Sequence, residues 1–154
     1  MPARIGVYCD VCNLYHCVRE SFEGRKLNYK EYIDFIAPLG DVQLCKAYGA
    51  QSEDEATPFI TFLKKLGFQT YWKRVKFHSN NAKADWDVGI TIDMVRDLPS
   101  LDVIVLGSAD SDMVPAVKYI QEQNTDVIIL ASKISVELRR AAYKAIEITE
   151  GMVQ

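Results

Sequence analysis

Histidine, cysteine and long apolar runs are scarce in this sequence. No stretch of the 154 residues approaches the ~20 consecutive apolar residues that span a bilayer. Residues 1–4 lead directly into strand-like sequence, without the apolar core or the cleavage site of a signal peptide. These absences predict a cytoplasmic protein with no membrane segment.

Two histidines and four cysteines supply no zinc-binding pattern, because His16 and His78 stand apart and only one Cys-x-x-Cys pair is present. That pair, Cys9 and Cys12, falls between a predicted strand and a predicted helix, where a thioredoxin-like redox motif would lie. We favour the simpler interpretation that Cys9 is a buried strand residue, since free cysteine is among the most buried residue types. The other three cysteines then act as small space-filling side chains.

The motifs of several phosphate-binding and hydrolytic families are also missing. The first predicted strand is followed by neither a Gly-x-Gly-x-x-Gly fingerprint nor a Walker lysine, and no Gly-x-Ser-x-Gly elbow occurs. Asp10 lacks the second aspartate, two residues further on, of haloacid-dehalogenase-type phosphatases. Residues 72–74 read Trp-Lys-Arg where a response-regulator receiver needs its phosphoacceptor aspartate. A hydrolase of small phosphates is therefore only a minor alternative.

Charge is distributed unevenly along the chain. The net charge of −3 disfavours a dedicated nucleic-acid-binding protein. Residues 64–84 nevertheless contain no acid, and they combine basic with aromatic side chains: Lys64, Lys65, Lys73, Arg74, Lys76, Lys83, Phe68, Tyr71, Trp72 and Phe77. Basic groups hold a phosphate backbone while aromatic faces stack bases, so this segment is a candidate path for a single nucleic-acid strand. A core strand at 68–72 followed by a solvated loop explains the pattern equally well.

The composition is that of an ordinary globular domain, with 49% apolar and 25% charged residues, and we expect one domain over residues 1–154. Apolar β-branched runs predict strands at residues 5–9, 42–48, 68–72, 103–106 and 127–130, with a short edge strand at 145–148. Periodicity and Pro or Gly stops predict helices at residues 13–20, 29–37, 54–66, 86–98 and 136–143. Asp112 is expected to cap a further helix, with Pro115 in its first turn. In the helix at 86–98, Val88, Ile92 and Val95 are expected to form the buried stripe.

Strands that alternate with helices predict βαβ units with right-handed crossovers. The fold class is therefore α/β, a three-layer sandwich around a central, mostly parallel sheet of five or six strands, for which we take the doubly wound order 3-2-1-4-5. In such a sheet ligands bind at the carboxyl ends of the strands, where the order reverses between strands one and four.

Aspartates stand at this edge. Asp10 ends the first strand, Asp110 and Asp112 follow the fourth, and Asp85 and Asp87 begin the helix that follows strand three. Each one alone could be a helix cap or a loop residue. Three separate segments that converge on one edge favour a cation, because like charges at close range repel by several kcal/mol. Carboxylates suit Mg²⁺, so the sequence predicts a hard-cation site.

Asp87 and Asp93 share one predicted helix. Their six-residue separation corresponds to about 9 Å along the axis, at roughly 1.5 Å per residue, and places them on different faces. We therefore expect Asp87 to bind the metal, Asp93 to support it or to be solvated, and Asp85 to cap the helix.

Taken in order, these residues resemble the NYN domain family, the LabA-like (DUF88) branch of the PIN-like nuclease superfamily. The resemblance spans nearly the whole chain and combines four pieces. They are the apolar strand that leads into Asp10-x-x-Asn13-Leu14, Lys83 followed by Asp87-Val88 and Asp93, Ser108-x-Asp110-Ser111-Asp112 with Pro115, and the segment at 132–138.

The resemblance implies a PIN-like fold and a ribonuclease that uses Mg²⁺ or Mn²⁺ to activate water for in-line attack on a phosphodiester. By carry-over, the metal-binding and catalytic residues are Asp10, Asp87, Asp110 and Asp112, and the supporting residues are Asn13 and Ser108, with Asp93. From the basic segment, the residues expected to contact single-stranded or structured RNA are Lys73, Arg74, Lys76 and Lys83.

Some positions depart from the family pattern. Ala109 replaces the glycine of the usual Ser-Gly-Asp-Ser-Asp-Phe, and glycine freedom bears on the turn that presents Asp110. Met113 replaces the phenylalanine, and Tyr143 and Ala145 stand where Asp and Phe are frequent. All principal acids are present, so these changes bear on substrate and activity level more than on metal binding.

Two hypotheses follow. The first is a metal-dependent ribonuclease. The second is a regulatory module with little or no turnover, which binds RNA or acts through a protein partner. The sequence leaves open whether the chain forms a homodimer.

Overall fold

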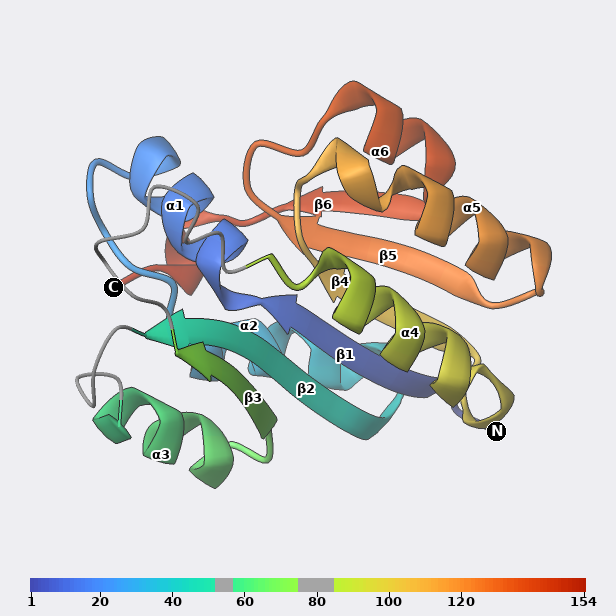
Figure 1. Ribbon diagram of the computed structural model, residues 1–154, viewed down its shortest axis with the longest axis horizontal. Coiled ribbons are helices and arrows are strands. Elements are labelled where there is room, and N and C mark those ends of the chain that lie inside the picture. The colour runs from blue at the N-terminus through green and yellow to red at the C-terminus, as the bar shows by residue number, and fades with distance from the viewer. Residues whose placement is uncertain (52–56, 75–84) are drawn as a thin grey trace.

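The computed structural model describes residues 1–51, 57–74 and 85–154. Its centre is an all-parallel sheet of six strands in the order β3-β2-β1-β4-β5-β6 (Figure 1). The strands are β1 (Arg4–Asp10), β2 (Asp41–Gln51), β3 (Gln69–Arg74), β4 (Val103–Gly107), β5 (Asp126–Ala131) and β6 (Lys144–Glu147). The predicted α/β class and strand order are confirmed, and the sixth strand extends the sheet in parallel beside β5.

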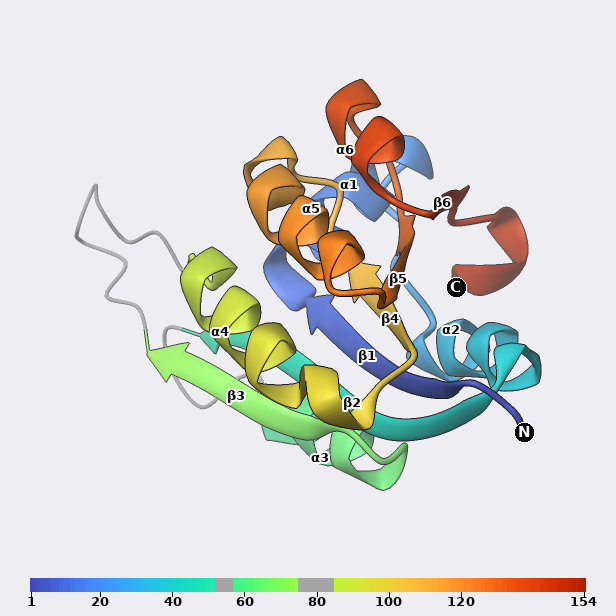
Figure 2. The same cartoon turned by 90° about the vertical axis from the view of Figure 1, so that its right-hand side faces the viewer.

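Helices cover both faces of the sheet (Figure 2). They are α1 (Val11–Ser21), α2 (Tyr29–Ile36), α3 (Thr57–Lys65), α4 (Asp87–Asp97), α5 (Val114–Glu122) and α6 (Val136–Ala141). The strand order places α1, α2 and α3 on one face and α4, α5 and α6 on the other, because each parallel crossover is right-handed. The helix predicted at 54–66 is described from Thr57 onward, and residues 52–56 lie outside the described residues.

The apolar runs of β1, β4 and β5 form the core between the sheet and its helices. Val7, Ile104 and Ile129 are fully buried, as continuous apolar strands of a covered parallel sheet must be. Cys9 is also fully buried, and the four cysteines are free thiols, so the space-filling interpretation of Cys9 is confirmed.

Helix α4 corrects the predicted buried stripe. Val88 and Ile92 are 73% and 49% exposed, whereas Ile90 and Met94 are fully buried. The reason is that the sheet beneath α4 presents polar side chains, so that the helix turns acidic groups toward it as well as apolar ones. A period of 3.6 residues identifies a helix but does not say which of its faces meets the sheet.

None of the helices within the described residues has the length and apolar character needed to cross a membrane.

Gly107, the last residue of β4, allows α1 and α2 to pack closely on the sheet. A Cβ at this position would lie 2.8 Å from the Tyr32 hydroxyl and 3.0 Å from Cδ1 of Leu14. The Tyr32 hydroxyl is not free to withdraw, because it donates a hydrogen bond of 2.8 Å to the carbonyl of Leu130.

We expect Gly107→Ala to lower the free energy of unfolding by about 1–3 kcal/mol, the usual cost of overpacking a core. Urea unfolding measures the change. Gly151→Ala is the matched control, because its Cβ would meet nothing closer than the Thr149 hydroxyl at 3.9 Å. Equal stability of both variants would contradict the close packing inferred at Gly107.

Candidate metal centre

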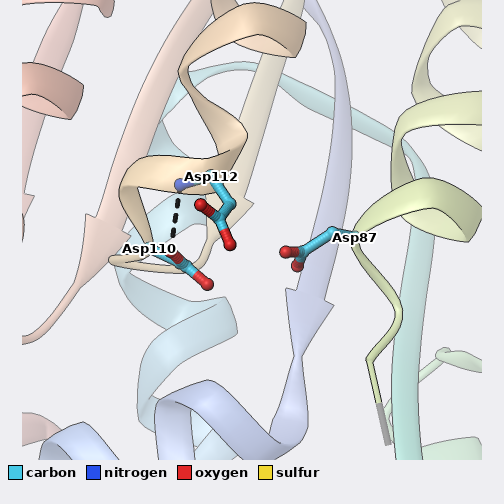
Figure 3. Close-up of side chains that lie close together, drawn as sticks. All are labelled: Asp87, Asp110 and Asp112. Carbon is cyan, nitrogen blue, oxygen red and sulfur yellow. Dashed lines mark hydrogen bonds between the residues drawn. The ribbon is translucent and has the colours of Figure 1, made fainter. Parts of the chain in front are cut away.

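Three aspartates meet at the carboxyl edge of the sheet. Asp110 and Asp112 follow β4, and Asp87 faces them from the first residue of α4 (Figure 3). Each offers a carboxylate oxygen, and these oxygens all lie within 4.8 Å of one another. Asp87 and Asp110 are half-buried and Asp112 is exposed. The structure therefore brings together three of the four carboxylates predicted to bind a metal.

A tight turn after β4 positions Asp110 and Asp112. Asp110 caps the 3₁₀ turn η4 (Ser111–Met113), and its carboxylate accepts the backbone N–H of Asp112 at 2.9 Å. The buried Ser108 hydroxyl accepts the N–H of Asp110 at 3.3 Å. Asp112 lies inside this turn, so its predicted role as helix cap was wrong, and Met113 precedes α5 without a side-chain cap. The error arose because the turn begins two residues earlier than the helix periodicity indicates.

Ala109 fits this turn without a glycine's backbone freedom. Among the described residues other than glycine, only Glu23, Asn124 and Lys133 have positive φ angles, and Ala109 is not one of them. Its N–H donates to the side-chain oxygen of Asn13 at 2.9 Å. The alanine therefore leaves the backbone that presents Asp110 in an ordinary conformation.

Asp10 and Asn13 connect this turn to β1. Asp10 ends β1 and caps α1, where its carboxylate accepts the N–H of Asn13 at 3.2 Å. Asn13 in turn holds Ala109, so α1 and the β4 turn are fixed to each other. Asp10 is only 7% exposed and lies outside the group of three carboxylates whose oxygens fall within 4.8 Å.

The backbone at the start of α4 fixes Asp87. The Asp87 N–H donates to the Asp85 carboxylate at 2.8 Å. The N-cap of α4 is Trp86, which makes no side-chain cap bond, so the predicted cap at Asp85 was one residue too early. The Asp87 carbonyl accepts the Thr91 hydroxyl at 2.7 Å.

Burial, together with nearby negative charge, raises the pKa values of Asp87 and Asp10 at this edge. Burial raises the pKa of the Asp87 carboxyl to about 7, and the charges of Asp85 and Asp110 add to the rise. Burial likewise raises the pKa of Asp10 to about 6, although the Asn13 N–H opposes the shift. Asp87 therefore retains a proton in part of the molecules near neutral pH unless a cation compensates its charge.

Asp93 lies on the sheet side of α4, away from the three-carboxylate cluster. Its carboxylate accepts the Tyr48 hydroxyl at 2.6 Å. One turn further along, Asp97 accepts the Tyr8 hydroxyl at 2.7 Å and the Lys46 ammonium at 2.8 Å. Sequence reasoning missed this second set of contacts. The signal was the spacing, because acids four residues apart share a helix face, and Lys46 and Tyr48 share a strand face.

The basic and aromatic segment divides between core and surface. Phe68 is buried at 3% exposure, and Trp72 packs edge-on against Phe59 with 6.1 Å between ring centroids. Tyr71 is 36% exposed and stacks on Tyr48 at 5.1 Å. Two of the predicted RNA-binding residues, Lys73 and Arg74, are exposed at the end of β3. The other two, Lys76 and Lys83, lie outside the described residues.

The sequence model of the NYN domain matches residues 4–149. The chain belongs to the NYN domain family. This NYN chain is 24% identical over 161 residues to the low amplitude and bright protein LabA of Synechococcus elongatus, an alignment that covers 97% of the chain and 86% of LabA. A crystal structure of a protein of unknown function from Vibrio parahaemolyticus superimposes with a TM-score of 0.90 at 28% identity, covering 99% of this chain and 97% of the other.

The resemblance stated from the sequence motifs is thereby confirmed over nearly the whole chain. The NYN domain is a PIN-like nuclease family, and the cluster of Asp87, Asp110 and Asp112 lies at the edge of the sheet where such α/β folds bind ligands.

The pKa of Asp87, raised by burial and by the neighbouring carboxylates, predicts a pH-dependent stability of this NYN domain. A carboxyl whose pKa is higher in the folded state costs stability as pH rises from its ordinary value of 3.8, and the full cost is present above about 7. We therefore expect Asp87→Asn to stabilise the metal-free protein at pH 8 and to change it little at pH 4. Because the side chain is partly exposed, solvent screening limits the gain to about 1 kcal/mol or less.

Urea unfolding in the presence of a chelator at the two pH values measures this difference. A variant that is less stable than the wild type at pH 8 would show that burial and the neighbouring charges do not destabilise the Asp87 carboxylate.

Proposed function

We propose that this NYN domain is a metal-dependent ribonuclease that hydrolyses phosphodiester bonds in RNA. The observation that carries the proposal is the meeting of Asp87 with Asp110 and Asp112, which come from separate segments of the chain and have oxygens within 4.8 Å. Membership of a PIN-like nuclease family supports the reaction class.

The residues at this edge fit a hard divalent cation. All three side chains supply carboxylate oxygens, which are the ligands that Mg²⁺ and Mn²⁺ prefer, and the cluster offers no soft sulfur ligand. Asp87, Asp110 and Asp112 would hold the cation, with Asp10 beside them. A bound Mg²⁺ or Mn²⁺ supplies Lewis-acid stabilisation of phosphate oxygens and lowers the pKa of water.

The chain itself supplies position and charge. Ser108 and Asn13 hold the turn of Asp110 through backbone hydrogen bonds of 3.3 and 2.9 Å, to the N–H groups of Asp110 and Ala109 respectively. Asp10, with its raised pKa of about 6, is suited to accept a proton near the attacking water at neutral pH. Arg74, together with Lys76 and Lys83 outside the described residues, remains a proposed contact for the RNA backbone.

The decisive test compares the wild type with Asp110→Asn on single-stranded and hairpin RNAs, with Mn²⁺, Mg²⁺ or chelator. We expect cleavage that depends on the metal and falls by roughly 100-fold or more in the variant, because an amide is a weaker ligand than a carboxylate. Asp126→Asn is the matched control, since Asp126 begins β5 at the opposite edge of the sheet.

Other outcomes identify other functions. Inactivity of all three proteins with RNA still bound would favour the regulatory module over the ribonuclease. Cleavage of small phosphate monoesters without RNA affinity would favour the phosphatase. Equal cleavage by the wild type and Asp110→Asn would show that the activity does not come from this cluster.

The raised pKa values predict the pH dependence of the reaction. Cation binding requires ionised carboxylates, and the pKa of Asp87 is about 7 and that of Asp10 about 6. At subsaturating Mn²⁺ we expect kcat/KM for RNA to rise with pH up to about 7 and then to level off. Saturating Mn²⁺ should shift this rise to lower pH, because the cation competes with protons. A profile that does not move with Mn²⁺ concentration would contradict this account.

A further inference from the structure

Asp85 and Trp86, the two residues that precede Asp87, are held in place by contacts with strands of the sheet. The Lys73 ammonium, at the end of β3, donates a hydrogen bond of 2.8 Å to the carbonyl oxygen of Asp85. The same ammonium lies 4.1 Å from the centroid of the Trp86 ring, within the range of a cation–π interaction. Trp86 donates from its Nε1 to the carbonyl oxygen of Gly49 on β2 at 2.9 Å. Two strands therefore hold the chain immediately before the metal-binding aspartate.

The helix backbone is shaped around the Trp86 ring. A Cβ at Gly89 would lie 2.9 Å from Cε3 of that ring, so only glycine leaves room for it there. Glycine within a helix is less favourable than alanine, and α4 accepts this cost in its first turn. The Tyr48 ring packs against Trp86 with 5.4 Å between centroids. The indole is thus enclosed by residues from β2, β3 and α4.

Asp87 needs such a constraint because its neighbours repel it. The carboxylates of Asp110 and Asp112 face it across the edge of the sheet, and Asp85 adds a further negative charge beside it. In the absence of a cation, this repulsion favours any movement of α4 that carries Asp87 outward. If Asp87 is already held in place, none of the binding free energy of the cation is spent on moving it back toward the other carboxylates.

We propose that Lys73, Trp86 and Gly89, which we call the α4 anchor, are positioning residues that hold Asp87 against Asp110 and Asp112 for a divalent cation. The inference rests on the cation site of the proposed function. It also gives Lys73 a role other than RNA contact, because its ammonium is already hydrogen-bonded to the Asp85 carbonyl oxygen and packed on the Trp86 ring.

The direction in which Mn²⁺ affinity changes when Lys73 is removed distinguishes a positioning role from a purely electrostatic one. Lys73 carries a positive charge beside an acidic cluster, so its removal by Coulomb effects alone should strengthen the binding of a cation. Loss of the anchor should instead weaken binding, because Asp87 is no longer held in place. Gly89→Ala provides a second contrast, since it should favour the helix by propensity while displacing the Trp86 ring.

The experiment titrates Mn²⁺ into the full chain by calorimetry at pH 8, above the pKa of about 7 of the Asp87 carboxyl. We expect Lys73→Met and Gly89→Ala to bind Mn²⁺ about tenfold more weakly than the wild type, the usual effect of losing a group that orients a metal ligand. Lys73→Arg should stay within about twofold, because arginine keeps both a donor and a cation for the Trp86 ring. Lys65→Met is the matched control, as Lys65 is exposed at the end of α3.

Two further readouts exclude trivial explanations. The melting temperatures of the variants should show that they are folded, and RNA affinity in chelator should be unchanged in Gly89→Ala, which alters no charge. Unchanged or tighter Mn²⁺ binding in Lys73→Met and Gly89→Ala would overturn the inference, and so would loss of RNA affinity with intact Mn²⁺ binding. If the wild type itself binds no Mn²⁺, the anchor and the proposed function fail together. If it binds Mn²⁺ but cleaves no RNA, only the proposed function fails.

Discussion

Repulsion between carboxylates organises the functional edge of this NYN domain. The parallel sheet brings the ends of β1 and β4 side by side, so Asp10 and Asp110 are close for topological reasons alone. Helix α4 then adds Asp87 to the same edge. Mutual repulsion of these carboxylates raises the electrostatic energy of the metal-free state. The fold holds the charges together through backbone hydrogen bonds, close packing and polar contacts with the sheet.

These constraints come from several parts of the chain. Asn13 ties α1 to the turn after β4, Ser108 secures the backbone of Asp110, and Asp85 accepts the N–H of Asp87. Each of these groups acts on the backbone beside an acid rather than on the carboxylate that would bind a cation. The carboxylate oxygens of Asp87, Asp110 and Asp112 are therefore positioned while their ligand capacity is largely preserved.

The sequence allowed the sheet and the converging acids to be predicted, because apolar runs and the residues that end them are local features. The alternation of strands and helices indicated parallel βαβ units, and the strand order was taken from the doubly wound arrangement and the resemblance to PIN-like folds. The orientation of α4 could not be predicted, since the polar character of Tyr8, Lys46 and Tyr48 beneath it decides which face it turns inward. The contact of Lys73 with Trp86 joins residues from β3 and the start of α4, and only the folded chain places them together.

The polar face that α4 turns toward the sheet limits how this helix can move. Apolar burial is non-directional, so by itself it does not specify the rotation of a helix about its axis. The bonds from Tyr8 and Lys46 to Asp97, and from Tyr48 to Asp93, fix the rotation of α4 about its axis. A mostly buried ion pair such as Lys46–Asp97 is frequently no more stabilising than apolar side chains of the same shape. Selection for thermal stability alone would therefore tend to replace this layer with apolar residues, and selection for a precisely aimed Asp87 would preserve it.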